Sequence, residues 1–331
     1  MATLKDVAQL ACVDVSTVSR ALNNTSYVHP ETKARILAAV KELSYQPNVL
    51  AQGLRQGKRH TIGVVVPRLH MTVFAEITEG IEEEARKLGY ATLICNTEDD
   101  PKIEREGLNR LRNGFVDGII IAGTGHNTRL LKDIRASGLA ITQVIRQQEQ
   151  TISSVVANYK TSGYAAAKYL ASKGCREIGI INGSMDLAPY RERYNGFQKA
   201  AKEFGLNETS SISAAPIHSL QYGYQCALDL LDQNPCLDAI MAAVDAQGIG
   251  AMRALKEKGI KVPEQICLIS LTGHIIGGML ETAMTSMEIP AHEIGKKAAQ
   301  MTIEEIEAPT DQKPSSQHLV FSALLIERES C

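Results

Sequence analysis

Apolar positions in the first 45 residues recur at the spacing of amphipathic helices. Thr3 is followed three residues later by Asp6, a pair that can cap the start of a first helix. After a tight turn at Cys12, Asp14 can cap a second helix, and a third would begin at Pro30. The positions expected on the buried faces are Leu4, Val7, Ala8, Ala11, Val18, Ala21, Leu22, Ile36, Val40 and Leu43. Short helices joined by such a turn predict a helix-turn-helix domain.

From residue 61 the pattern changes to short strand-like runs that alternate with helical stretches, most of which end at glycine. The expected strands cover 61–67, 91–96, 117–123, 140–145, 177–183, 239–245 and 265–271, and the clearest helices cover 74–89, 164–174 and 251–259. Strand, helix and strand follow one another near 62–96 and again near 154–182. The remaining length, about 270 residues, is enough for two lobes of this kind. The sequence therefore predicts an α/β fold built on parallel sheets.

Composition adds limits to this picture. Of the 331 residues, 44% are hydrophobic and 22% are charged, as in a globular protein, and no apolar run approaches the roughly 20 residues of a membrane helix. The first ten residues lack the apolar core of a signal peptide, so we expect a cytoplasmic protein with no membrane partner. The seven cysteines are scattered and never spaced C-x-x-C, and the eight histidines are dispersed. We expect free thiols, no metal site and no cofactor.

The basic residues are concentrated at the amino-terminal end. Residues 1–60 carry eight Lys and Arg against four Asp and Glu, a charge of +4, whereas the whole chain has a net charge of −2. The stretch DVSTVSRALN, residues 14–23, offers short hydroxyl side chains for phosphate oxygens and one arginine, Arg20, whose fork matches guanine. This pattern favours a helix that reads the major groove. The alternative is an ordinary solvated surface on which Arg20 has no partner in DNA.

A longer resemblance supports the DNA-binding interpretation. TLKDVAQLACVDVSTVSRALN, then VHPETKARILAAVKELSYQPNVLAQGLRQGK and TIGVVVP, resembles the headpiece, hinge and first core strand of the lactose/galactose (LacI-type) repressor family, without a gap over about sixty residues. It implies a helix-turn-helix headpiece over 1–46, a hinge helix and linker over 47–60, and a two-lobed, periplasmic-binding-protein-like core over 61–331. It also implies chain crossings between the lobes near residues 159 and 290.

The same resemblance assigns DNA contacts to individual positions. The residues placed to face base edges are Val15, Ser16 and Arg20. The residues placed to contact DNA phosphates are Thr17, Ser19, Asn23 and Tyr45, and we include Thr3 and Arg55 among the DNA-binding candidates. Leu54 matches the hinge leucine that enters the minor groove, although a plain linker containing Gly53 is the alternative. Cys12 stands where the family usually has glycine, so a strained left-handed backbone is expected there.

Candidates for an effector site come from strand ends and from the resemblance. They are Val73, Phe74, Arg146, Arg191, Arg193, His218, Asp245 and Thr272. The alternative for each is a local role, such as a core aromatic for Phe74 or a helix cap for Asp245. Ile145 and Thr272 stand where the family commonly has aspartates, which predicts a more positive cleft than usual. A neutral mono- or disaccharide is the expected effector, and a phosphorylated sugar is the alternative.

The chain lacks the short sequence signatures of common enzymes. It contains no G-x-x-x-x-G-K-[ST], no H-E-x-x-H, no G-x-S-x-G and no G-x-G-x-x-G that opens a helix after a strand. We therefore predict a non-enzymatic, homodimeric repressor of a carbohydrate-utilisation operon, which binds palindromic double-stranded operator DNA and responds to a sugar or sugar phosphate. The alternative is a cytoplasmic sugar-processing enzyme with an accessory nucleic-acid-binding domain.

Overall fold

The structure, a computed structural model, describes residues 2–23, 26–45, 58–211, 219–309 and 311–331. The chain divides into two compact units, the headpiece over residues 1–59 and the core over residues 60–331. No described helix is long and apolar enough to cross a membrane.

The headpiece contains three helices, as the sequence predicts: α1 (Leu4–Leu10), α2 (Val15–Asn23) and α3 (Pro30–Glu42). The expected cap is present, because the Asp6 amide donates to the Thr3 hydroxyl at 3.4 Å and the Thr3 amide donates to the Asp6 carboxylate at 2.7 Å. The fully buried positions are Val7, Ala8, Ala11, Val18, Ala21, Ile36 and Ala39. Leu4, Leu22, Val40 and Leu43 are only partly buried against this small core.

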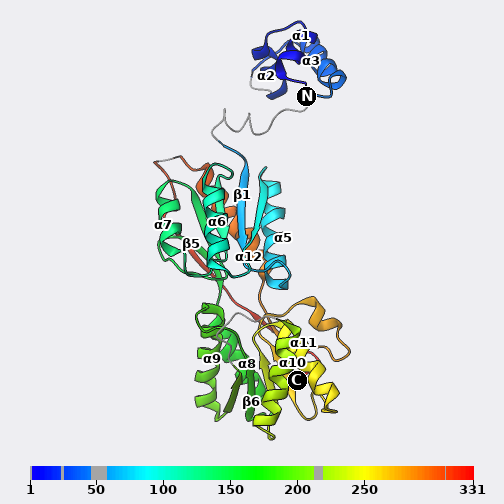
Figure 1. The fold of residues 1–331 in the computed structure, drawn as a ribbon, viewed down its shortest axis with the longest axis vertical. Helices are drawn as coiled ribbons and strands as arrows, with labels where there is room; N and C mark the ends of the chain where they lie inside the picture. The colour runs from blue at the N-terminus through cyan, green and yellow to red at the C-terminus, as the bar shows by residue number, and fades with distance from the viewer. Residues whose placement is uncertain (1, 24–25, 46–57, 212–218, 310) are drawn as a thin grey trace. The chain divides into compact units, whose positions relative to one another are not determined.

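The first lobe of the core is a six-stranded parallel sheet with helices on both faces (Figure 1). In spatial order its strands are β11 (His318–Phe321), β5 (Ser153–Ala157), β4 (Ala140–Val144), β3 (Gly118–Ile121), β1 (Thr61–Val66) and β2 (Ala91–Asn96). Its helices are α5 (Thr72–Lys87), α6 (Pro101–Arg112), α7 (Thr128–Ala136) and α12 (Ala291–Glu307). Helices α5 and α12 pack over one apolar cluster, and α6 and α7 pack over another.

The second lobe repeats this arrangement with one antiparallel edge strand. In spatial order its strands are β12 (Leu324–Ile326), β10 (Thr285–Glu288), β9 (Cys267–Ser270), β8 (Ala239–Ala242), β6 (Glu177–Ile181) and β7 (Asn207–Ser211), and only β12 runs antiparallel to its neighbour. Its helices are α8 (Tyr159–Ser172), α9 (Ala188–Phe204), α10 (Leu220–Gln233), α11 (Asp245–Glu257) and the 3-10 helix η1 (Ile275–Met279). The seven predicted core strands and three predicted core helices are all present.

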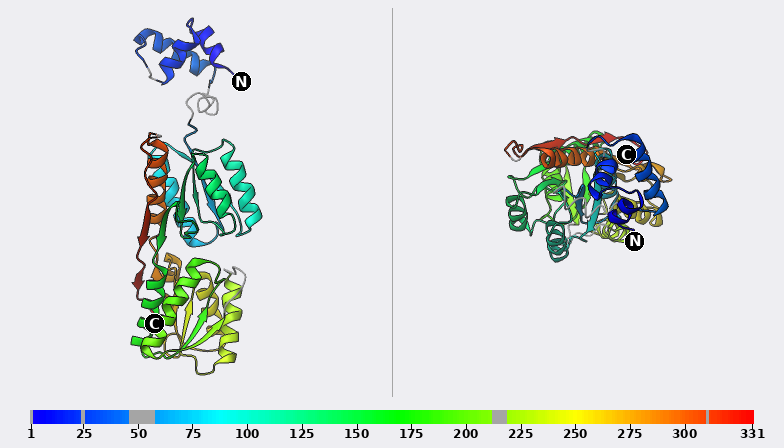
Figure 2. Two further views of the ribbon diagram at one scale, coloured as in Figure 1. Left: turned by 90° about the vertical axis from the view of Figure 1, so that its left-hand side faces the viewer. Right: turned by 90° about the horizontal axis from the view of Figure 1, so that it is seen from above.

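The chain passes between the lobes three times. The crossings between β5 and α8, near residue 159, and between β10 and α12, near residue 290, confirm the prediction. A third crossing, at residues 322–323 between β11 and β12, was not predicted, and Figure 2 shows these two red strands running from the first lobe to the second. Each crossing is a link of one or two residues. The three links bring the carboxyl ends of both sheets to the boundary between the lobes.

Candidate functional site

Helix α2 packs one face against the headpiece core and leaves the other face open. Val18 and Ala21 are buried, whereas Ser16 and Arg20 are exposed and Val15 keeps 38% of its surface. The three residues expected to face base edges are therefore accessible. Among the expected phosphate contacts, Thr17 and Ser19 are partly buried and Asn23 is exposed, and the Asn23 amide donates to the Ser19 hydroxyl at 3.4 Å.

The turn before α2 has the strained conformation expected from its sequence. Cys12 has a φ of 52°, in the left-handed region that normally favours glycine. Thr3 serves as the cap of α1, and Tyr45 packs against the headpiece core, so any DNA contact would be an added role for each. Leu54, Arg55 and His218 lie outside the described residues. The DNA roles assigned to all these positions stay predictions.

Two adjoining cavities lie between the lobes of the core. The larger, about 430 Å³, is lined by the starts of α5, α10 and α11 and by Thr272, His274 and Ile276. The smaller, about 30 Å³, is lined by side chains from both lobes, including Phe74, Arg146 and Arg193. The two cavities share Met71, Val73, Val244 and Thr272. We treat them as one cleft, which contains five of the predicted effector residues besides Asp245.

Arg193 is a buried cation with incomplete hydrogen bonding. It comes from α9, is 3% exposed, and donates from Nη1 to the Ala243 carbonyl at 3.2 Å. Its guanidinium carbon lies 4.9 Å from the centre of the Tyr159 ring, a cation–π contact. Nε is buried and has no partner among the described residues. Burial lowers the pKa of Arg193, which shows the cost of keeping this charge in the protein interior.

The backbone around Arg193 is fixed by a close helix contact. A Cβ added to Gly163 of α8 would lie 2.0 Å from the Arg193 carbonyl oxygen. Only glycine allows α8 and α9 to approach this closely. The helix pair therefore sets where the guanidinium enters the cleft.

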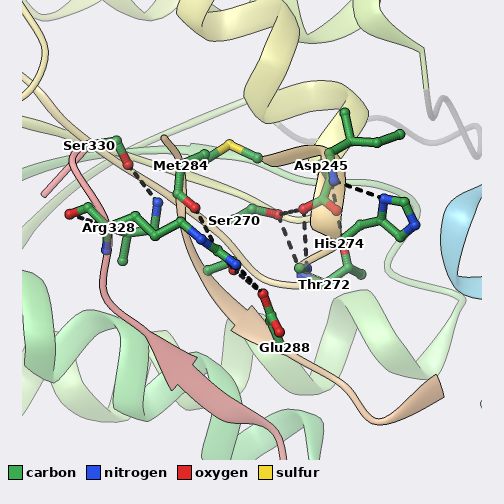
Figure 3. A network of polar contacts seen from close by, with 12 residues as sticks. Asp245, Ser270, Thr272, His274, Met284, Glu288, Arg328 and Ser330 are labelled. Carbon is green, nitrogen blue, oxygen red and sulfur yellow. Dashed lines mark hydrogen bonds and ion pairs between the residues drawn. The ribbon is translucent and has the colours of Figure 1, made fainter. Parts of the chain in front are cut away.

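Asp245 is a buried carboxylate in the lining of the larger cavity, and Figure 3 shows it beside Ser270 and Thr272. One carboxylate oxygen, Oδ1, accepts hydrogen bonds from the Ser270 hydroxyl and from the Gly273 amide at 3.1 Å. The other, Oδ2, is buried and has no partner in the described chain. Burial raises the pKa of Asp245. The sequence placed Asp245 at the end of a strand, but it is the first residue of α11, because β8 ends at Ala242.

One of the arginines predicted to make the cleft more positive is paired with a carboxylate. Arg146 donates to both carboxylate oxygens of Asp99, at 2.5 and 3.3 Å, and lies 5.7 Å from the centre of the Phe74 ring. Asp99 thus supplies the negative charge that Ile145 and Thr272 cannot. Arg191 was expected to point into the cleft, but it lines neither cavity and donates to the carbonyls of Met185 and Asp186.

The remaining predicted cleft residues have structural contacts as well. Phe74 lies in the buried core of the first lobe and still lines the smaller cavity. Val73 lines both cavities, and Thr272 accepts a hydrogen bond from the Asp245 amide at 3.2 Å. Sequence reasoning missed Tyr159 and Tyr190, which are buried in the smaller cavity. Burial raises the pKa of Tyr159 to about 12, so its hydroxyl stays protonated.

A further polar contact joins the lobes at the rim of the larger cavity. His274 Nε2 lies 3.1 Å from the Glu76 carboxylate of α5, while His274 Nδ1 accepts from the Ile276 amide at 3.2 Å. Burial raises the pKa of Glu76, and His274 opposes that shift. The sequence gave no signal for this pair, since its members are almost 200 residues apart. Among the described residues, no group of three or more potential metal ligands could hold an ion.

An accessible recognition helix and a two-lobed core with a polar cleft together define a class: DNA-binding regulators that respond to a small molecule. Residues 3–48 match the model of bacterial regulatory proteins of the lacI family, and residues 59–326 match that of periplasmic binding proteins and the sugar binding domain of the LacI family. The chain belongs to the LacI family of transcription regulators. The enzyme alternative is not favoured, because its relatives are repressors.

Individual relatives match over almost the whole chain. The ribose operon repressor of Halalkalibacterium halodurans is 30% identical over 93% of this chain and 91% of its own length. The transcriptional repressor PurR of Haemophilus influenzae is 31% identical over 92% and 91%. Among solved structures, a complex of the transcriptional regulator CelR with cellobiose has a TM-score of 0.75 at 25% identity and full coverage of both chains. The lac repressor dimer bound to operator has a TM-score of 0.90 at 21% identity, covering 99% and 98%, and supports the fold.

Proposed function

We propose that this chain represses carbohydrate-utilisation genes and that a neutral sugar bound between the two lobes controls its affinity for DNA. The observation that carries the proposal is the pair of buried, unsatisfied atoms in the cleft, Arg193 Nε and Asp245 Oδ2. An orphaned donor and an orphaned acceptor are both costly to bury. A polyol satisfies both, because each hydroxyl can accept from the arginine and donate to the carboxylate.

The charges of the cleft favour a neutral effector over a phosphate ester. Arg146 is neutralised by Asp99, and Arg191 lines neither cavity, so Arg193 is the unneutralised cation of the smaller cavity. Asp245, in the adjoining cavity, would repel an anion. The buried rings of Phe74 and Tyr159 suit the apolar face of a sugar. The names of two relatives, a ribose operon repressor and a regulator solved with cellobiose, agree with this class of effector.

The DNA-binding half of the proposal rests on the headpiece. We assign residues 1–46 to DNA reading, 47–60 to a hinge and 61–331 to effector binding and dimerisation. A single three-helix headpiece reads only a few base pairs, so a homodimer on a palindromic site is expected. The effector then acts by linkage, because a sugar that binds one arrangement of the lobes more tightly shifts the population toward it.

The test is a calorimetric titration of the full chain with D-ribose, cellobiose and ribose 5-phosphate, followed by operator-binding measurements with any ligand that binds. Binding of a neutral sugar that changes operator affinity would support the proposal. Binding of the phosphate ester alone would overturn the neutral effector. A chain that selects no palindromic site from random DNA would overturn the regulator.

A further inference from the structure

Three cysteines that are far apart in the sequence meet at one edge of the second lobe. Cys175 precedes β6, Cys267 begins β9, and Cys331 follows β12. Cys175 and Cys267 belong to one buried cluster of the second lobe, and Cys331 packs against the same cluster. Cys175 and Cys267 are buried, whereas Cys331 is partly exposed. We call this group the thiol triad.

Backbone contacts hold the three sulfurs in place. The Cys175 thiol and the Cys267 amide both point to the Asp238 carbonyl, at 3.9 and 2.9 Å. The Cys331 thiol lies 3.2 Å from the carbonyl of Leu268, the residue after Cys267. Residue 330 is tied to the same strand, because the Leu268 amide donates to its carbonyl at 2.8 Å. Cys331 therefore stays beside Cys267 through two hydrogen bonds that do not involve sulfur, from the Leu268 amide to the Ser330 carbonyl and from the Ser330 hydroxyl to the Leu268 carbonyl.

The surroundings favour reaction at Cys267. The neighbouring thiols of Cys175 and Cys331 lower its pKa, and the positive charge of Lys173 acts in the same direction. The pKa of Cys331 is raised by the neighbouring Cys267 thiol and by burial. A cysteine with a lowered pKa beside one with a raised pKa is the arrangement of a reacting and a resolving cysteine.

We propose that the thiol triad is an oxidation site for hydrogen peroxide, at which Cys267 and Cys331 become joined by a disulfide. The Cys267 sulfur attacks peroxide: an S–O bond forms, the O–O bond breaks, and hydroxide leaves and becomes water with the proton lost by the Cys267 thiol, giving a sulfenic acid. The Cys331 sulfur then attacks the sulfenic sulfur; the S–S bond forms, the S–O bond breaks, and the oxygen leaves as water with the Cys331 proton. The two sulfurs lose two electrons, and peroxide is reduced to two molecules of water.

The reaction has a direct readout, because trypsin places the three cysteines in separate peptides: residues 174–176, 262–296 and 329–331. The reduced full chain is treated with hydrogen peroxide, alkylated, digested without reductant and analysed by mass spectrometry. We expect peptide 329–331 linked to peptide 262–296, and we expect dithiothreitol to release it. A map without this link, or with 174–176 joined to 262–296 in its place, overturns the assignment.

Matched variants separate the triad from the other thiols. Cys236 is exposed and lies outside the triad, so Cys236→Ser should leave the link intact, whereas Cys331→Ser should abolish it. In Cys331→Ser, dimedone should trap a sulfenic acid on peptide 262–296. Circular dichroism of the reduced variants checks folding, and the wild-type map decides the assignment even if a variant does not fold. Formation of the same link in unfolded wild-type chain at the same rate would also refute the proposal, because the folded geometry would then play no part.

Discussion

The most informative perturbation of the cleft is Arg193→Met, which keeps an unbranched side chain of similar reach and removes the charge. Arg193 is almost fully buried, and its one hydrogen bond within the described chain goes to the Ala243 carbonyl at 3.2 Å. A buried charge with so little compensation contributes poorly to stability, and an apolar replacement is often neutral or stabilising. We therefore expect the melting temperature of the variant to equal or exceed that of the wild type.

The effect on effector binding should be the opposite. A hydrogen bond to a charged group contributes about 1.5–3 kcal/mol. Each bond that the guanidinium makes to the sugar should therefore cost roughly 10- to 150-fold in Kd when it is lost. The variant should be as stable as the wild type and nearly unable to respond to the effector.

Calorimetry with the best sugar from the panel, together with thermal melts of the same samples, checks both expectations. Arg191→Met is the matched control, because Arg191 lies two residues away on the same helix and bonds to the carbonyls of Met185 and Asp186. It should change Kd by less than about twofold, because the proposal gives Arg191 no hydrogen bond to the sugar. An unchanged Kd in Arg193→Met, or an equal loss in both variants, would refute the role given to Arg193.

Three further outcomes follow from the structure. Arg20→Ala should relax base preference at one position of each half-site, with a loss of about 1–3 kcal/mol in binding free energy, because its contact is to a base. Ser19→Ala should weaken binding to all sites alike, because its contact is to a phosphate. A binding-site selection that shows no change of preference for Arg20→Ala contradicts this. Gly163→Ala places a Cβ 2.0 Å from the Arg193 carbonyl oxygen and should lower the free energy of unfolding by about 1–3 kcal/mol. In the control Gly107→Ala, the added Cβ lies 3.8 Å from the Cys95 side chain, and the free energy of unfolding should rise by up to about 1 kcal/mol. Urea unfolding measures both. Burial raises the pKa of Asp245, so its contribution to stability is present in acid and is lost as pH rises through the folded pKa. Asp245→Asn should therefore have a higher melting temperature than the wild type at pH 7, and this difference in melting temperature should close toward pH 4. A gap that does not change with pH would exclude Asp245 as its cause.

The headpiece could be predicted in detail because its determinants are local. The Thr3–Asp6 cap, the Pro30 start and the apolar spacing of each helix all act within a few residues. The left-handed backbone of Cys12 is different, because only the family resemblance predicted it. In the core, long buried strands such as β1 could be predicted equally well.

The cleft was harder to predict because its charges are paired across long sequence separations. Asp99 pairs with Arg146 from 47 residues away, and counting the arginines of the sequence could not reveal this partner. Arg191 and Arg193 are two residues apart, and on a helix two positions correspond to about 200°, nearly opposite faces. On the basis of the sequence alone, this geometry could have excluded Arg191 from the predicted effector site. The short strands β11 and β12 have mostly exposed or partly exposed positions, and so the third crossing gave no clear hydrophobic signal.

The three crossings also determine when each lobe can be completed during synthesis. The chain leaves the first lobe at residue 158 and returns with α12 and β11, residues 291–321. At about 5–20 residues per second, the ribosome needs roughly 8–30 s to synthesise residues 159–321. Until then, the apolar face of the first lobe that packs against Ile294 and Ala298 of α12 is exposed. The first lobe to be started is thus finished after most of the second, and a nascent chain has a period in which a molecular chaperone can bind that face.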